Sequence, residues 1–148
     1  MAVSQAMLGY GSTFEIATSG DSPTDFVSLG EIFNITPPSA NLDMIDVTHM
    51  QSPSRTREFI SGLIDPGECS FELNYIPDST GDIELREILA LGIGVDRRRQ
   101  CRIRYPNGVT TTFSGELMTY EKTVPTDDKM TANVSFKVTG IETYGFST

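Results

Sequence analysis

The 148-residue sequence has no tryptophan, one histidine and two cysteines, and its 20 acidic residues outnumber its 11 basic ones. A net charge of −9 repels a nucleic-acid backbone, which argues against a sequence-specific DNA-binding protein. No apolar run reaches the roughly 18–20 residues of a membrane-spanning helix, and residues 1–10 lack the basic start and apolar core of a signal peptide. We therefore expect a soluble protein that is made in the cytoplasm.

The sequence also has too few cysteines and histidines, and no acidic residues at the spacing of a metal-binding motif, for a metal or redox site. Cys69 and Cys101 have no CxxC spacing and fall at apolar positions of expected strands, so we expect buried free thiols. Asp127 and Asp128 are adjacent, unlike the alternating acids of a calcium-binding loop, and the HExxH motif of zinc proteases is absent. The sequence therefore predicts no metal and no cofactor.

A two-residue hydrophobic alternation dominates three segments and predicts strands with one buried face. It is clearest over residues 130–140 and recurs at residues 69–75 and 100–105. The residues expected to face inward are Met130, Ala132, Val134, Phe136, Val138, Cys69, Phe71, Leu73, Tyr75, Cys101, Ile103 and Tyr105. Weaker strand patterns span residues 12–18, 26–35 and 42–47.

Residues 109–122 are rich in β-branched and aromatic side chains and follow an Asn-Gly pair that suits a tight hairpin. We expect this segment to pair antiparallel with the strand that holds Cys101. Its inward register moves from Phe113 to Met118, and Gly115 between them predicts a β-bulge.

One segment has a helical period instead. Residues 81–91 follow capping residues and place Leu85, Ile88 and Leu89 on one stripe, which predicts a short α-helix. Antiparallel strands with a single helix favour an antiparallel β-sandwich or small barrel with one flanking α-helix. We expect residues 1–148 to form a single domain.

Residues 48–66 form the expected long loop, close to twenty residues where about 4–6 are usual. Its apolar side chains, such as Met50 and Phe59, are unusual for a solvated loop and suggest a segment that buries them on binding a partner. A plain Ω-loop packed on its own domain remains the alternative.

The loop also holds the chain's only histidine, His49, with Asp46, Ser52 and Glu58 nearby in sequence. A nucleophile needs a base and an orienting acid, but no GxSxG or comparable frame places these residues. A hydrogen-bonding or interface role is commoner for such a histidine. A small hydrolase that uses His49 stays as an alternative.

The only basic concentration comprises Arg97, Arg98 and Arg99, and it continues through Arg102 and Arg104. Outward arginines of a strand commonly pair with acidic neighbours of the same chain. On an acidic protein the same strip also suits self-association with acidic residues of another copy.

Three blocks resemble the tail tube (major tail) proteins of long, non-contractile tailed bacteriophages and of phage-derived particles such as gene transfer agents. They are residues 46–75, which include Asp-Val-Thr-His-Met-Gln-Ser-Pro and Ser-Phe-Glu-Leu-Asn-Tyr, residues 77–91 and residues 125–140. The resemblance implies a structural virion protein, not an enzyme, in the tail of a siphovirus-like particle. A type VI secretion-like tube protein is the alternative.

The resemblance further implies hexameric rings that stack into a hollow tube through which DNA reaches the host cell without specific binding. Partners would be other copies, a tape-measure protein, a tail terminator and distal tail or baseplate proteins. An immunoglobulin-like C-terminal domain, present in some members, is expected to be missing. The long loop, residues 48–66, would reach a neighbouring ring and become ordered on polymerisation.

Two sets of contact residues are expected on this basis. The inter-subunit or inter-ring set is His49, Met50, Ser52, Pro53, Arg55, Arg57, Phe59, Ile60, Arg97, Arg98 and Arg99. The set expected to face the lumen is Thr131, Asn133 and Ser135.

Overall fold

A computed structural model describes residues 3–18, 25–91 and 97–146, and within these residues it contains nine strands, one α-helix and one 3-10 turn. The strands are β1 (Thr13–Ala17), β2 (Phe26–Ser28), β3 (Ile32–Thr36), β4 (Asn41–Asp46), β5 (Phe59–Asp65), β6 (Glu68–Asn74), β7 (Arg98–Arg104), β8 (Val109–Thr123) and β9 (Thr131–Phe146). The helix α1 spans Thr80–Ala90, and the 3-10 turn η1 spans Pro53–Arg55. The expected mainly antiparallel β fold with one flanking helix is confirmed.

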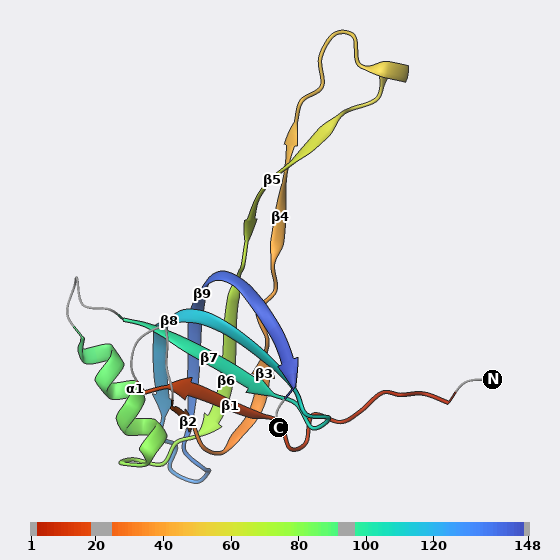
Figure 1. Cartoon of the computed structure of the whole chain (residues 1–148). Helices are drawn as coiled ribbons and strands as arrows, with labels where there is room; N and C mark the ends of the chain where they lie inside the picture. Colours follow the sequence, from red (N-terminus) through yellow and green to blue (C-terminus); the bar gives the residue numbers. More distant parts are fainter. Residues whose placement is uncertain (1–2, 19–24, 92–96, 147–148) are drawn as a thin grey trace.

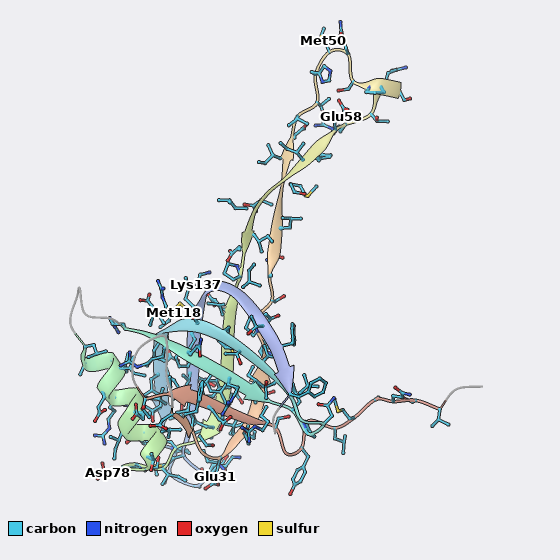
Figure 2. The ribbon with its side chains drawn as sticks, in the orientation of Figure 1. Glu31, Met50, Glu58, Asp78, Met118 and Lys137 are labelled. Atoms are coloured by element: carbon cyan, nitrogen blue, oxygen red, sulfur yellow. The ribbon has the colours of Figure 1, made fainter. Side chains whose placement is uncertain are left out.

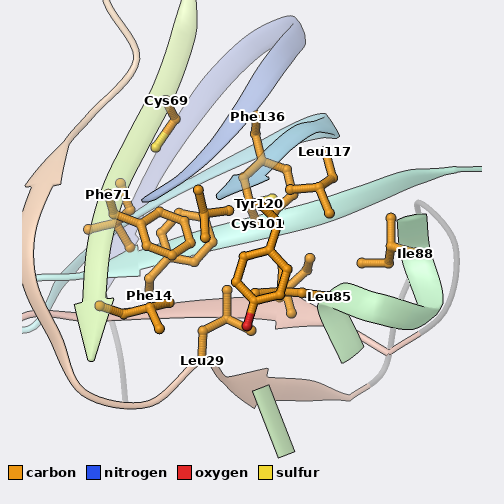
Figure 3. Close-up of a cluster of buried hydrophobic side chains, with 14 of the residues drawn as sticks. Phe14, Leu29, Cys69, Phe71, Leu85, Ile88, Cys101, Leu117, Tyr120 and Phe136 are labelled. Carbon is orange, nitrogen blue, oxygen red and sulfur yellow. The ribbon is translucent and has the colours of Figure 1, made fainter. Parts of the chain in front are cut away.

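Seven of the described strands form one antiparallel sheet in the order β2-β1-β7-β8-β9-β6-β3. This sheet curls over itself: the rings of Phe14 in β1 and Phe71 in β6 lie 4.3 Å apart although three strands separate them in the sheet (Figures 1 and 3). Phe136 of β9 stacks on both rings, at 5.7 and 6.1 Å. The concave face of a single sheet therefore encloses the core, as in a partly closed barrel.

The alternation correctly predicts which side chains fill this core. Cys69, Phe71 and Leu73 of β6 are buried, as are Cys101 and Ile103 of β7. In β9, Ala132, Val134, Phe136 and Val138 are buried. Tyr75 and Tyr105 lie just outside a strand and are only partly buried at the rim of the core, and Met130, which precedes β9, is also only partly buried. In the described chain neither cysteine forms a disulfide and both are buried, and burial raises the pKa of Cys69 to about 12.

Helix α1 covers one end of the curled sheet (Figure 1). Ser79 caps it, because its hydroxyl accepts a 3.3 Å hydrogen bond from the backbone N–H of Asp82. Leu85 and Ile88 are buried as expected, but Leu89 is 40% exposed. Gly81 and Asp82 occupy the rest of the buried stripe, and Leu89 lies about 100° around the helix from Ile88, toward solvent.

The β7–β8 hairpin confirms the expected antiparallel pairing, and Gly108 in its turn has φ +88°. The bulge is not at Gly115, which is buried in register with Phe113 and Leu117. The register shifts instead between Leu117 and Thr119, so Met118 points outward and Tyr120 returns to the core. The sequence-based position of this bulge was therefore wrong by three residues.

The weaker patterns correspond to real strands with different limits. Residues 26–35 divide into β2 and β3, because Gly30 between them has φ +103°. The last strand continues past residue 140, where Gly140 has φ +82°, as far as Phe146.

The expected irregular loop over residues 48–66 is wrong for its second half. Phe59–Asp65 is β5, which pairs antiparallel with β4 in a separate two-stranded sheet. Sequence alternation fails here because this ribbon has no buried face within the chain. The irregular part is limited to residues 47–58 at its end.

Candidate assembly surface

Strands β4 and β5 form a long arm, defined here as residues 41–65, that projects from the curled sheet (Figures 1 and 2). Nearly all of its strand residues are exposed. The exposed large apolar side chains of the arm are Leu42, Met44, Ile45, Val47, Met50, Phe59, Ile60, Leu63 and Ile64. An isolated two-stranded ribbon is marginally stable in water, and a contiguous exposed apolar surface commonly marks an interaction site. The arm is therefore the main candidate for an assembly surface.

The base of the arm is fixed to the sheet by a close backbone approach. Gly67 joins β5 to β6 with φ +83°, and a Cβ at this position would lie 2.3 Å from the carbonyl oxygen of Ser39. The carbonyl of Gly67 accepts a 3.1 Å hydrogen bond from Val138 N–H. Lys137 Nζ lies 3.4 Å from Asp65 Oδ1. Only glycine fits this crossing of the two chain segments, which sets where the arm leaves the body.

The tip of the arm is held by its own hydrogen bonds. Val47 N–H donates to Glu58 O at 2.9 Å, and Glu58 N–H donates to Thr48 Oγ1 at 2.8 Å. Asp46 accepts hydrogen bonds from Thr48 N–H and from Arg57 Nη1, which lower the pKa of the Asp46 carboxyl, with the bonds from Thr48 contributing most. Ser54 and Arg55 both have positive φ, 56° and 57°. The tip thus has a defined conformation within a single chain.

Of the residues considered for a hydrolase, the structure brings His49, Ser52 and Glu58 together, whereas Asp46 bonds to Thr48 and Arg57. The Ser52 hydroxyl donates to Glu58 Oε2 at 2.6 Å and lies 3.2 Å from His49 Nδ1. Glu58 Oε2 lies 3.4 Å from the same His49 nitrogen. A catalytic triad uses both ring nitrogens, one toward the nucleophile and one toward the acid. Here Ser52 and Glu58 both lie next to the same ring nitrogen, Nδ1, and the Ser52 hydroxyl donates to Glu58. The geometry is therefore that of a structural hydrogen-bond cluster.

The remaining arm residues expected at contacts have distinct positions. Met50 is fully exposed at the tip (Figure 2), and Pro53 begins η1. Phe59 and Ile60 are about half exposed at the start of β5. Sequence reasoning missed the contribution of β4, whose Leu42, Met44 and Ile45 extend the apolar surface. The density of apolar residues from 42 to 47, without clear alternation, was the available signal.

The arginine strip divides into two environments. Arg102 and Arg104 pair with Glu15 at 2.8 and 3.4 Å, and Arg102 also lies 4.1 Å above the Phe26 ring, so these two arginines act within the chain. Arg98 is exposed, and Arg97 and Arg99 are partly buried. Their expected role between subunits stays a prediction.

The residues expected to face a lumen lie on the outer, convex face of the sheet. Thr131, Asn133 and Ser135 alternate with the buried residues of β9. Asn133 and Ser135 border a shallow polar hollow of about 340 Å³ with Glu72 and Thr119, whose hydroxyl lies 2.6 Å from that of Ser135. This face offers hydroxyls, an amide and a carboxylate, and the lumen assignment itself stays a prediction.

The fold is a curled antiparallel sheet with one helix and an arm that exposes apolar side chains. These features are typical of a structural subunit that associates with other chains. The model of the lambda phage tail tube protein family matches residues 9–145. The chain therefore belongs to this family, and it is a structural component of a virion tail tube. A comparison with curated protein sequences finds no match.

Solved structures share this fold at low sequence identity. A chain from the tail of an empty gene transfer agent particle aligns with TM-score 0.74 and 15% identity over 95% of this chain and 99% of the other. A chain from the anti-feeding prophage baseplate aligns with TM-score 0.76 and 8% identity over 97% and 98%. A chain from the sheath/tube terminator of an extracellular contractile injection system gives 0.71 and 12% over 97% and 99%. In the described residues, no helix is long and apolar enough to cross a membrane.

Proposed function

We propose that six copies of this protein form a ring, that the rings stack into a hollow tail tube, and that the arm contacts a neighbouring ring. The exposed apolar arm is the observation that carries this proposal. Each apolar side chain that becomes fully buried on assembly contributes roughly 1.5–3 kcal/mol before the entropy cost of association. The arm therefore holds enough unburied surface to drive a specific contact between copies.

The internal hydrogen bonds of the tip support a contact by a preformed element. His49, Ser52 and Glu58 hold the turn, while Met50 extends beyond it. A surface that is ordered before binding loses less conformational entropy on association. We propose that Met50, Pro53, Arg55, Arg57, Phe59 and Ile60 contact the neighbour and that His49 and Ser52 shape the tip.

The charge of the chain is compatible with DNA passage through such a tube. Six copies of net charge −9 carry a formal −54 per ring, which disfavours adhesion of DNA. We propose that the outer face of β9, with Thr131, Asn133 and Ser135, lines the lumen. Its polar, hydrogen-bonded surface fits a wall past which DNA slides.

We further propose that the protein is not an enzyme, because the hydrogen bonds of the His49 cluster hold the turn together and the cluster lies at an exposed tip. Chains from the anti-feeding prophage baseplate and from an extracellular contractile injection system share this fold, and a type VI secretion-like tube is the alternative proposal. The family match favours the tube of a long non-contractile tail. Partners would then be a tape-measure protein, a tail terminator and distal tail or baseplate proteins.

Electron microscopy of the purified protein, alone and with its tail initiator, tests the proposal. We expect six-fold rings or tubes with a central channel. A chain that stays monomeric under both conditions, at concentrations where size-exclusion chromatography shows it folded, would contradict the proposal.

A further inference from the structure

The C-terminal half of β9 has a free backbone edge. β8 pairs with β9 as far as Phe146, whereas β6 pairs only with residues 131–137. Beyond Val138, whose N–H donates to Gly67 O, no other strand of the described chain pairs with this edge. An unpaired strand edge is a template to which another extended segment can add.

This free edge borders an apolar groove of about 400 Å³ at the base of the arm. Pro38, Ile64 and Pro66 form one wall, and Ile141 and Tyr144 of β9 form the other. Ile141 is 83% exposed and Tyr144 is 69% exposed, so the groove is open to a partner. The one charged lining residue, Glu142, accepts a 2.8 Å hydrogen bond from the Tyr144 hydroxyl.

The same chain carries a segment with matching chemistry at its other end. Residues 3–10 have no charged side chain and no proline, so every backbone N–H can donate. They form no helix or strand; residues 7–10 border a hollow beside β3, and Figure 1 shows the chain before them leading away from the sheet. Leu8 is 82% exposed and Tyr10 is 91% exposed. With Ala6 they alternate, so in an extended strand these three side chains share one face.

We propose that residues 3–10 of one copy add as a strand to the free edge of β9 in a second copy, with apolar side chains of the segment in the groove. Backbone hydrogen bonds would supply affinity, and the groove would select alternate apolar side chains. Each copy has one segment and one groove, so the contact is heterologous and propagates into rings or filaments. This inference rests on the proposed self-assembly, and its groove shares only Ile64 with the exposed apolar side chains of the arm.

Disulfide trapping between copies tests the contact. Two single variants, Leu8→Cys and Tyr144→Cys, are mixed in the full-length chain, assembled and oxidised, and a second pair, Tyr10→Cys with Ile141→Cys, covers a shifted register. All four positions are exposed, whereas the native Cys69 and Cys101 are fully buried. We expect a covalent dimer on a non-reducing gel in at least one mixture, at ten-fold or more above either variant alone.

Two controls make the result decisive. Thr119→Cys with Ser135→Cys in one chain checks oxidation, because these side chains already touch across β8 and β9. Leu8→Cys mixed with Glu87→Cys, an exposed position on α1, measures random collision. Absence of dimer above that level in both mixtures overturns the docking. If microscopy still shows tubes, the proposed function survives; a dimer without tubes supports the docking and counts against the tube.

Discussion

The hydroxyl of Tyr120 donates a 2.6 Å hydrogen bond to Asp82 Oδ1 and thereby joins β8 to α1 in the protein interior. Asp82 is only 4% exposed, and its other oxygen accepts from Asp78 N–H at 3.0 Å and pairs with Arg86 at 3.1 Å. The carboxylate thus has partners on both oxygens. It is the polar connection between the helix and the sheet.

Replacing Asp82 by alanine should destabilise the monomer by about 3 kcal/mol, because the Tyr120 hydroxyl and the Asp78 N–H lose a charged partner in a buried place. Tyr120→Phe removes one of these hydrogen bonds and should cost about 1–2 kcal/mol. Denaturant unfolding of both variants measures the difference. Equal stability of wild type and Asp82→Ala would show that α1 is held by apolar packing alone.

The ionisation of the Asp82 carboxylate makes the folding stability depend on pH. Burial opposes the ionisation of Asp82, but the hydrogen bonds from Tyr120 and Asp78 and the charges of Arg86 and Lys122 outweigh it and lower its pKa. Its contribution is therefore present above the unfolded pKa of about 3.9 and is lost as the pH falls through the folded value.

Asp82→Asn should remove this part of the acid dependence while the exposed acids keep theirs. Chemical unfolding at a series of pH values between about 2 and 6 tests this. If the wild type and Asp82→Asn lose stability in parallel over this range, the assignment to Asp82 is wrong.

The close approach of Gly67 to Ser39 predicts that a larger side chain at position 67 destabilises the protein by a steric clash. Gly67→Ala should be strongly destabilising or displace the arm, because its Cβ would lie 2.3 Å from the Ser39 carbonyl oxygen. Gly108→Ala is the matched control: its φ is +88°, and among the described atoms nothing lies within 4 Å of a Cβ there. We expect about 1–2 kcal/mol for the control, the cost of the left-handed conformation alone. Similar thermal stabilities for the two variants would exclude a clash at the arm base.

The strands that the sequence predicts well are those with one face buried in their own chain. In β6, β7 and β9, residues such as Phe71, Ile103 and Phe136 alternate with polar ones because the core requires it. The arm has no such face, so β5 carries no alternation and its pairing with β4 was missed.

The bulge in β8 was misplaced for a related reason. Phe113 and Tyr120 both face the core at an odd separation, so one extra residue must be accommodated between them. Composition favours a bulge at Gly115, but Gly115 is buried, and a Cβ there would lie 3.3 Å from the Lys137 carbonyl oxygen and 3.4 Å from Phe136 Cβ. The extra residue is Met118, since contacts with other strands decide its place. The sequence singled out His49, Ser52 and Glu58 but did not predict their contact, because the hairpin register is what returns Glu58 to Ser52.

Leu63 should matter for assembly but not for folding. It is 85% exposed on β5, so Leu63→Ser should leave monomer stability within about 0.5 kcal/mol of wild type. If the arm docks on another copy, the variant should need at least a several-fold higher concentration to polymerise. Val124→Ser, at a residue 66% exposed outside the arm, is the control. Light scattering against concentration compares them, and normal polymerisation of Leu63→Ser would argue against docking of this face.

Variants of Ser52 and His49 at the tip of the arm distinguish a structural role of this cluster from a catalytic one. Ser52→Ala removes the hydroxyl that donates to Glu58 and accepts from the His49 backbone N–H, so we expect a less ordered tip and weaker polymerisation. His49→Ala leaves the Ser52–Glu58 hydrogen bond in place and should have the smaller effect. Amide hydrogen exchange at residues 47–58 and polymerisation assays measure both variants. A hydrolytic activity of the wild type that His49→Ala abolishes, with tubes still forming, would instead establish the cluster as a catalytic site.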